Sequence, residues 1–254
     1  MKLKELLLLY LLCCIASCSD NTITNSRVQT TFKFTHNWDG ELVTNTNFNT
    51  IQYTNENGEL LSIERLRYII SNITFTATSG ENLVINGHNL VDLTHSTNLS
   101  YSPTTLILAG NYNVSFTFGL NNEDNAQNYS DLNSVSFNVP ENLGGGYHYM
   151  QFDGKFINSN SLEQGFNYHA IRAVNTLGET LTFPKDTFFT VNLGTITISD
   201  NIEIEIKMNI AEWFKNPNTW DLNQLNQMLM PNAAAQDLMY QNGQNVFSLG
   251  EISQ

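Results

Sequence analysis

The side chains best suited to chemistry in this sequence are histidines, because three of the five continue an apolar face of an expected strand. These are His36, His148 and His169, each two positions away from a large apolar residue. Side chains alternate between the two faces of a strand, so each of these imidazoles is expected to face the interior. His88 and His95 stand in polar, turn-like stretches, where a solvated imidazole is expected.

A buried imidazole must be hydrogen-bonded or bound to a metal, because each unpaired buried nitrogen costs about 1–3 kcal/mol. Taken singly, each of the three inward-facing histidines fits a structural hydrogen bond better than a ligand role. Taken together, and with thioethers nearby, they fit a copper site, since imidazole suits copper and soft sulfur favours the cuprous state. The oxidation state stays open at this stage.

The N-terminus has the order of a bacterial lipoprotein signal peptide over residues 1–17. Two lysines precede the apolar run 6–12, and the small residues 16–17 come just before Cys18. Residues 15–17 resemble a lipobox, so Cys18 is expected to be lipidated and to anchor the chain in the membrane. The expected location is the bacterial cell envelope, at the outer membrane, on its periplasmic or surface face. The alternative is an ordinary signal peptide with an incidental cysteine.

Cysteine content and charge exclude several classes of function. The three cysteines all lie at or before position 18, so the body has no thiol for a disulfide, a thiolate metal site or a nucleophile. The net charge is −13, and the sequence lacks the clustered Lys and Arg that binding to nucleic acid or anionic lipid requires. Neither nucleic acid nor anionic lipid is therefore expected as a partner.

The elements that must position the histidines are mainly strands. Apolar and polar residues alternate over 112–118 and 202–208, and Asn-Gly and Ser-Gly turn signals separate many short strands. A short helical lead-in is expected at 62–65, before a strand over 66–77. Helical spacing returns over 210–242, interrupted by Pro217 and Pro231. The pattern predicts an all-β fold, an antiparallel β-sandwich (Ig-like or jelly-roll-like) with short helical segments near the C-terminus.

The expected domain organisation is a signal peptide over 1–17, a polar tether over 18–30 and one β-sandwich domain over 31–254. Residues 19–30 are polar and without periodicity, as expected of a tether. The remaining length suits a single β domain.

Several segments of this chain resemble the MbnP-like copper-binding domain family, which is associated with methanobactin systems and is common among bacterial lipoproteins. The matching segments run through most of residues 31–250. The most specific are the stretches Gly-Gly-Gly-Tyr-His-Tyr-Met at 144–150 and Tyr-Ile-Ile-Ser-Asn at 68–72; the others lie at 32–36, 89–93, 114–120 and 166–169.

The resemblance implies a β-sandwich exposed outside the inner membrane and a histidine-based copper site. By position it assigns the copper ligands to His36, His148 and His169. Some members have tryptophans just before the glycine-rich segment, one of which can be oxidised and join the copper site. This chain reads Phe137–Asn142 there, so the resemblance implies no such ligand.

The leading function from sequence is a non-enzymatic copper-binding envelope lipoprotein that acquires, stores or hands over the metal, with an envelope partner protein. The alternative is a lipoprotein that binds a partner protein or glycan through exposed aromatics such as Tyr101, Tyr129 and Tyr240, with structural histidines. A third reading is a glycan hydrolase with paired carboxylates, for which no pair can be nominated. The sequence carries no nucleophile elbow, phosphate-binding loop or His-Glu-x-x-His motif.

Overall fold

The computed structural model describes residues 26–254. The expected signal peptide, Cys18 and residues 18–25 of the expected tether lie outside the described residues. The fold begins earlier than residue 31, because β1 (Arg27–Val28) already pairs with β9 (Ile107–Leu108), and β2 (Thr30–Trp38) starts at Thr30. Val28 and Thr30 are buried, so apolar contact and pairing hold a stretch whose composition alone is typical of a linker.

The strand that organises the fold is β6 (Arg65–Ala77). One of its edges pairs with β7 (Asn82–Asp92). The other edge pairs with β11 (Met150–Ile157) over residues 65–68 and with β10 (Gly110–Phe118) over residues 70–77. The partner changes between residues 68 and 70, and a register shift with a left-handed Asn72, φ 50°, follows just after this change. Such bulges bend a strand, so β11 leaves the sheet in a different direction from β10.

Within residues 26–254, eight strands form the larger sheet. Besides the four above, its members are β4 (Tyr53–Thr54), β5 (Leu60–Leu61), β12 (Glu163–Ala170) and β15 (Phe189–Ile198). Five described strands form the smaller sheet: β2 with β3 (Glu41–Leu42), β8 (Ser100–Tyr101), β16 (Ile202–Asn209) and β17 (Phe247–Ser253). A separate hairpin joins β13 (Ala173–Asn175) to β14 (Thr182–Lys185).

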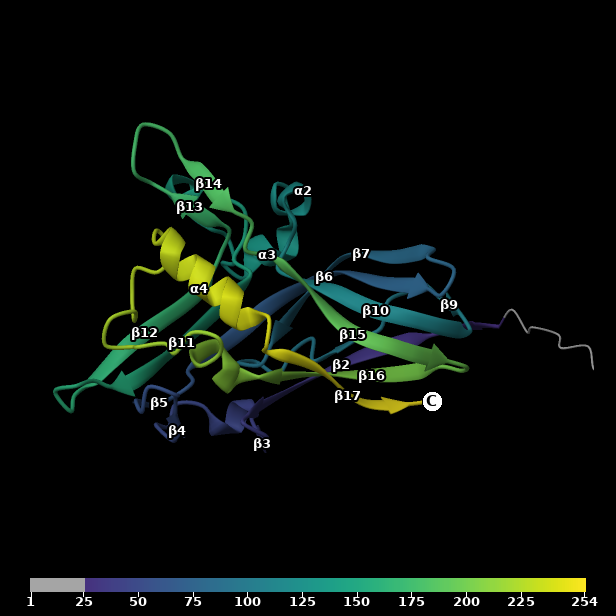
Figure 1. Ribbon diagram of the computed structural model, residues 1–254, viewed down its shortest axis with the longest axis horizontal. Coiled ribbons are helices and arrows are strands. Elements are labelled where there is room, and N and C mark those ends of the chain that lie inside the picture. The colour runs from purple at the N-terminus through teal and green to yellow at the C-terminus, as the bar shows by residue number, and fades with distance from the viewer. Residues whose placement is uncertain (1–25) are drawn as a thin grey trace, which may run out of the picture.

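The two sheets pack face to face and enclose the core, as Figure 1 shows. Phe32 and Phe75 meet across the layers at 6.2 Å between ring centroids, and Phe116 meets Phe247 at 5.4 Å. Burying each such side chain contributes about 1.5–3 kcal/mol. The expected β-sandwich is therefore confirmed. One pairing departs from the antiparallel expectation, because β2 and β16 run parallel.

Helices are short and lie at the edges of the sheets. The C-terminal helical segments are confirmed as the 3₁₀ turn η4 (Ile210–Phe214) and α4 (Ala233–Gly243), which lie before Pro217 and after Pro231. The expected helical lead-in at 62–65 is wrong, because these residues run extended into β6. Residues 122–143 contain helices that the sequence pattern did not indicate: α2 (Asn122–Asn125), α3 (Ser130–Ser134) and η3 (Glu141–Leu143). A further 3₁₀ turn, η2, spans Asn45–Asn47. None of the helices in the described range is long and apolar enough to cross a bilayer.

Candidate metal site

The outer face of the β6, β11 and β12 strands carries an array of polar side chains. Residues paired across strands point to the same face, so the register gives two rows: Arg67, Gln151 and His169 in one, Arg65, Asp153 and Asn167 in the next. The intervening positions, which include Tyr68, Met150 and Tyr168, are buried and face the interior of the sandwich. This alternation places His169 outside the main core, on the side covered by the segment 122–148.

The ring of His169 is held by a carboxylate. Its Nε2 lies 2.8 Å from Asp153 Oδ1, and because a carboxylate only accepts, Nε2–H donates. Asp153 also accepts hydrogen bonds from Arg65 and Asn167. Burial raises the pKa of Asp153, but these hydrogen bonds and the neighbouring charges outweigh it and hold that pKa well below its usual range. Asp153 is therefore ionised, and its hydrogen bond to Nε2 leaves Nδ1 as the second ring nitrogen of His169.

The ring of His148 is held by a backbone carbonyl. Both its backbone N–H and its Nδ1–H donate to the carbonyl oxygen of Phe137, each at 2.9 Å. Gln151 Nε2 lies 3.3 Å from the same Nδ1 and donates to the carbonyl oxygen of Ser136, also at 3.3 Å. Burial lowers the pKa of His148 to about 4, although the hydrogen bond to Phe137 opposes this shift. His148 is therefore neutral at physiological pH, with its lone pair on Nε2.

His148 and His169 lie against each other. Their ring centroids are 5.2 Å apart, with an angle of 85° between the ring planes. His148 Nε2 and His169 Nδ1 are both buried, and neither has a hydrogen-bond partner among residues 26–254. A buried polar nitrogen without a partner costs about 1–3 kcal/mol unless a ligand engages it. Metal-binding imidazoles carry this pattern, with the second nitrogen donating to a carboxylate or a carbonyl group.

A glycine turn delivers His148 to this place. Gly144, Gly145 and Gly146 all have positive φ values, of 100°, 66° and 74°. The turn folds residues 146–148 back along residues 137–139, through the bridge between Asn138 and Tyr147. A side chain at Gly146 would lie 2.7 Å from Nδ2 and 2.9 Å from the backbone oxygen of Asn125.

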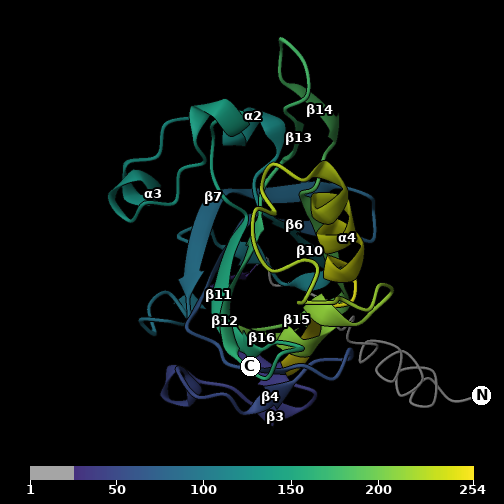
Figure 2. The same cartoon turned by 90° about the vertical axis from the view of Figure 1, so that its left-hand side faces the viewer.

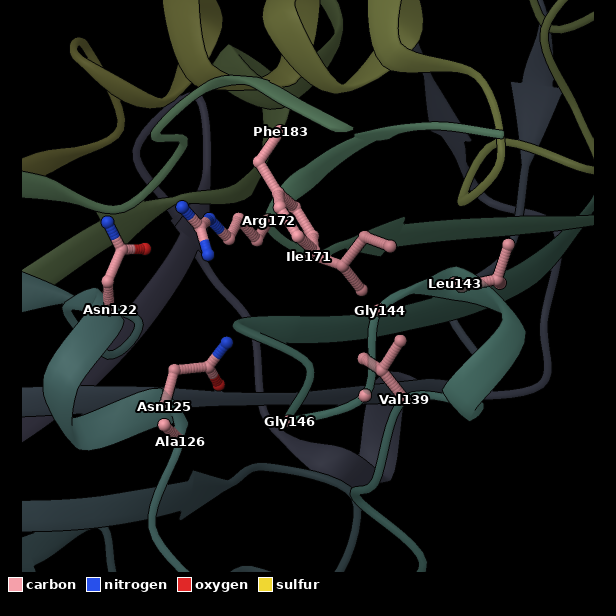
Figure 3. A pocket seen from close by; sticks show the side chains of 11 residues that line it. Asn122, Asn125, Ala126, Val139, Leu143, Gly144, Gly146, Ile171, Arg172 and Phe183 are labelled. Carbon is pink, nitrogen blue, oxygen red and sulfur yellow. The ribbon is translucent and has the colours of Figure 1, made fainter. Parts of the chain in front are cut away.

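Figure 3 shows the small pocket beside this turn, with Val139, Leu143 and Gly144 on one side and Asn125 on the other. Asn125 Oδ1 accepts the backbone N–H of Tyr147, which adjoins His148. Asn125, in α2, thus packs against the glycine turn and stabilises it. The three positive φ values turn the chain sharply just before β11 begins at Met150.

His36 lies apart from this pair, so the expected convergence of all three histidines is not found. It faces the interior with Phe32 and Phe34, as expected, and its Nε2 lies 3.2 Å from the hydroxyl of Tyr68. Tyr68 and Arg67 are consecutive in β6 and point to opposite faces, so the larger sheet separates His36 from His148 and His169. Face alternation within single strands correctly places a side chain inward, but it does not say on which side of a sheet another strand's residue lies.

The other histidines and aromatics divide between confirmed and wrong expectations. His95 is exposed in a turn, as expected, and contacts Asp92 through Nδ1 at 2.8 Å. His88 is not in a turn, because Gly87 continues β7 as a bulge; its ring packs on Tyr129. Tyr101, Tyr129 and Tyr240 are partly buried and pack against the core.

One side of the histidine pair opens into a cavity that the sequence did not indicate. The cavity measures about 530 Å³, and its lining includes His169, Met228 and Met230. No cluster of three or more His, Cys, Asp or Glu residues suited to a metal ion occurs in the part of the chain that the structure describes. The candidate site therefore consists of two imidazoles, with thioethers at its margin. Asp153 was also missed, although the alternation of residues 151–153 places it beside a histidine row.

The family model named MbnP matches residues 27–231. The chain belongs to the MbnP family. This family is methanobactin-related and copper-associated, which at a coarse level supports a non-enzymatic role. Among solved structures the chain is similar to MbnP from Methylosinus trichosporium, at 10% identity over 78% of this chain and 80% of that chain, with a TM-score of 0.48. No curated protein matches it.

Proposed function

We propose that this MbnP-family protein is a non-enzymatic copper-binding lipoprotein of the bacterial cell envelope, which acquires, stores or hands over the metal. One observation carries the proposal: two adjacent buried imidazoles each donate one N–H to a fixed acceptor and have the other nitrogen free. His148 and His169 are the proposed ligands, and His36 is a structural partner of Tyr68.

The donor set fits copper on chemical grounds. Neutral imidazole is a good ligand for copper, and a site with thioethers at its margin favours the cuprous state. In the neutral ring of each histidine, the nitrogen without a fixed acceptor presents its lone pair to the metal. The acceptors on the far nitrogens, Asp153 and the carbonyl group of Phe137, orient the two rings before the ion arrives.

The signal-peptide pattern and Cys18 motivate the envelope part of the proposal. A lipid on Cys18 would anchor the domain to the outer membrane and leave the site facing the periplasm or the outside. A partner protein in the envelope would supply or receive the copper.

The decisive experiment replaces each ligand by an amide that keeps its fixed hydrogen bond. In His148→Asn the amide nitrogen stands near the place of Nδ1 and donates to Phe137; in His169→Gln it stands near the place of Nε2 and donates to Asp153. Each variant therefore removes only the free nitrogen. Cuprous-ion affinity, measured by competition with a chromogenic chelator, should fall by more than the roughly 10–100-fold that changes at groups bonded to a ligand cause.

The matched controls are His95→Asn and His36→Gln. His95 is exposed, and His36 lies across the sheet, so both proteins should bind copper as the parent does. Equal copper affinity in all four variants, or no stoichiometric copper in the parent, would contradict the proposed function.

A further inference from the structure

Two methionines, Met228 and Met230, lie outside the main hydrophobic core. Within the described range, Met150, Met208 and Met239 are buried in the core. Met228 is 78% exposed, whereas Met230 is partly buried against Val139, Ile171 and Val174. The only large apolar side chain with greater exposure among residues 26–254 is that of Leu177. The methionine side chain is flexible, and its thioether sulfur is soft and polarizable.

Met228 has an unfavourable backbone conformation. Its φ of 57° lies in the left-handed region, which an L residue with a long side chain seldom adopts. Neighbouring contacts impose this conformation: the carbonyl oxygen of Asn226 accepts from the backbone N–H of Asn167 at 2.8 Å, and Leu229 is buried. Such imposed conformations cluster at functional sites.

The same segment is attached to the strand that carries His169. Gln236 Nε2 donates both to the carbonyl oxygen of His169, at 2.8 Å, and to that of Leu229, at 3.1 Å. Gln236 is itself buried. The buried amide of Gln236 therefore links the methionine segment, residues 226–231, to the backbone of His169. The loop that carries it lies between α4 and β12 in Figure 2.

The free nitrogens are closed to water, whereas the cavity beside them is open to it. His148 Nε2 and His169 Nδ1 are buried, yet the ring of His169 lines the cavity together with Met228 and Met230. Met228, at 78% exposed, lies at the open side of this lining, and His169 belongs to the same lining, so an ion in the cavity has both thioethers and one imidazole beside it. Asn142 and Asn167 are polar groups in the same lining, and the described lining contains no carboxylate.

We propose that Met228 and Met230 form a thioether relay that admits cuprous ion, and not zinc or cupric ion, to His148 and His169. This inference rests on the proposed function. The steps are ligand exchanges: a copper–sulfur bond forms as the donor's bond to copper breaks, and copper–nitrogen bonds then replace copper–sulfur bonds. The metal stays cuprous throughout, and no electron is transferred. Soft thioether ligands select Cu(I) over harder divalent ions.

The test follows transfer of Cu(I) from its bicinchoninate complex to the full-length protein by stopped-flow absorbance, anaerobically. The double variant Met228→Leu with Met230→Leu keeps apolar side chains of similar volume and loses both sulfurs. It should take up copper to the parent's stoichiometry, but about tenfold more slowly or worse, which corresponds to a loss of about 1.4 kcal/mol from the transfer transition state. Met239→Leu, in the core, should transfer at the parent's rate.

A second readout separates the relay from the histidine site. In NMR titrations with Ag(I), the ε-methyl signals of Met228 and Met230 should shift, also in the protein that carries His148→Asn and His169→Gln, whereas the Met239 signal should not. Unchanged transfer rates in the leucine variant together with unmoved methyl signals overturn the relay, even if the parent binds copper through its histidines. Failure of the parent to bind copper at all overturns the proposed function instead.

Discussion

At the scale of single residues, the most informative side chain is Asp153, which is not itself a proposed copper ligand. It fixes the tautomer of His169 and is itself kept ionised by Arg65 and Asn167. A carboxylate on the far nitrogen makes an imidazole a stronger donor to a metal. The strength of the candidate site therefore depends on a negative charge that lies one residue away from it.

The variant Asp153→Asn tests this dependence. The amide oxygen still accepts a hydrogen bond from His169, but the charge is lost, so copper affinity should fall by about 10–100-fold. Asp131→Asn is the matched control, because Asp131 contacts His88 on another part of the surface. Chelator competition measures both, and equal affinities in the two variants would contradict the role of Asp153.

His36 gives a prediction about acid stability. Burial lowers its pKa from 6.5 to about 3, so the unfolded chain binds a proton at this residue between these pH values and the folded protein does not. His36 should therefore not lower the free energy of unfolding above about pH 6.5. As pH falls from there towards 3, this free energy should decline by up to about 1.4 kcal/mol per pH unit.

The variant His36→Gln keeps a hydrogen-bonding group for Tyr68 and removes the titration. Between about pH 7.5 and 4.5 the parent should lose about 2–3 kcal/mol more stability than this variant, measured by urea unfolding. Parallel pH profiles of the two proteins would show that His36 is not the residue responsible.

The sequence predicted which histidines are buried but not how they meet. Period-two alternation was sufficient for His36, because β2 is a regular strand. It failed for His148, which lies before β11 and takes its direction from the turn at 144–146. His169 was placed beside Ile171 as an inward residue, whereas its true neighbours come from the register of β11, which no local pattern encodes.

At the scale of elements, the glycine turn is the part on which the site depends most. Its φ values exclude ordinary side chains, and it sets the bridge that brings His148 onto the Phe137 carbonyl oxygen. The turn signal was readable in the sequence, as was the strand that follows it. The support from α2 was not, because a four-residue helix leaves too short a pattern to recognise.

Gly146→Ala should therefore be strongly disruptive. Its Cβ would meet Asn125 at 2.7–2.9 Å with φ at 74°, so we expect a loss of about 2–4 kcal/mol in the free energy of unfolding and weaker copper binding. The control is Gly165→Ala, whose Cβ would meet only a carbonyl oxygen at 3.9 Å. Chemical unfolding of both variants, followed by copper titration, measures the difference; equal stability would refute the steric argument.

At the scale of the whole molecule, the sandwich class was predictable because alternation in 112–118 and 202–208 reports strands without any need for their partners. The start of the domain was not, since β1 and the first residue of β2 lie in a polar stretch held by remote contacts. The same limit applies to the parallel pairing, which joins the first long strand to one near the C-terminus.

Anchoring is a prediction for the complete chain. If the thiol of Cys18 carries the lipid, Cys18→Ser should shift the protein from the membrane fraction to the soluble fraction and abolish acyl labelling, since several buried acyl chains are needed for stable attachment. Cys13→Ser and Cys14→Ser serve as controls and should remain in the membrane fraction. Unchanged acyl labelling in Cys18→Ser would refute the lipoprotein assignment.

The parallel pair of β2 and β16 sets an order of events for a chain that emerges N-terminus first. Gln29 and Asn201 are hydrogen-bonded although they lie 172 residues apart in sequence, so the smaller sheet cannot close until most of the chain is available. Closing such a long loop is slow, whereas the hairpins β6–β7 and β11–β12 need only local contacts. We therefore expect nascent chains that end before residue 202 to protect these hairpins from proteolysis while residues 30–38 are still cleaved more readily. The half of the molecule that bears the histidine pair would then mature while β2 still lacks its longest pairing, the one with β16.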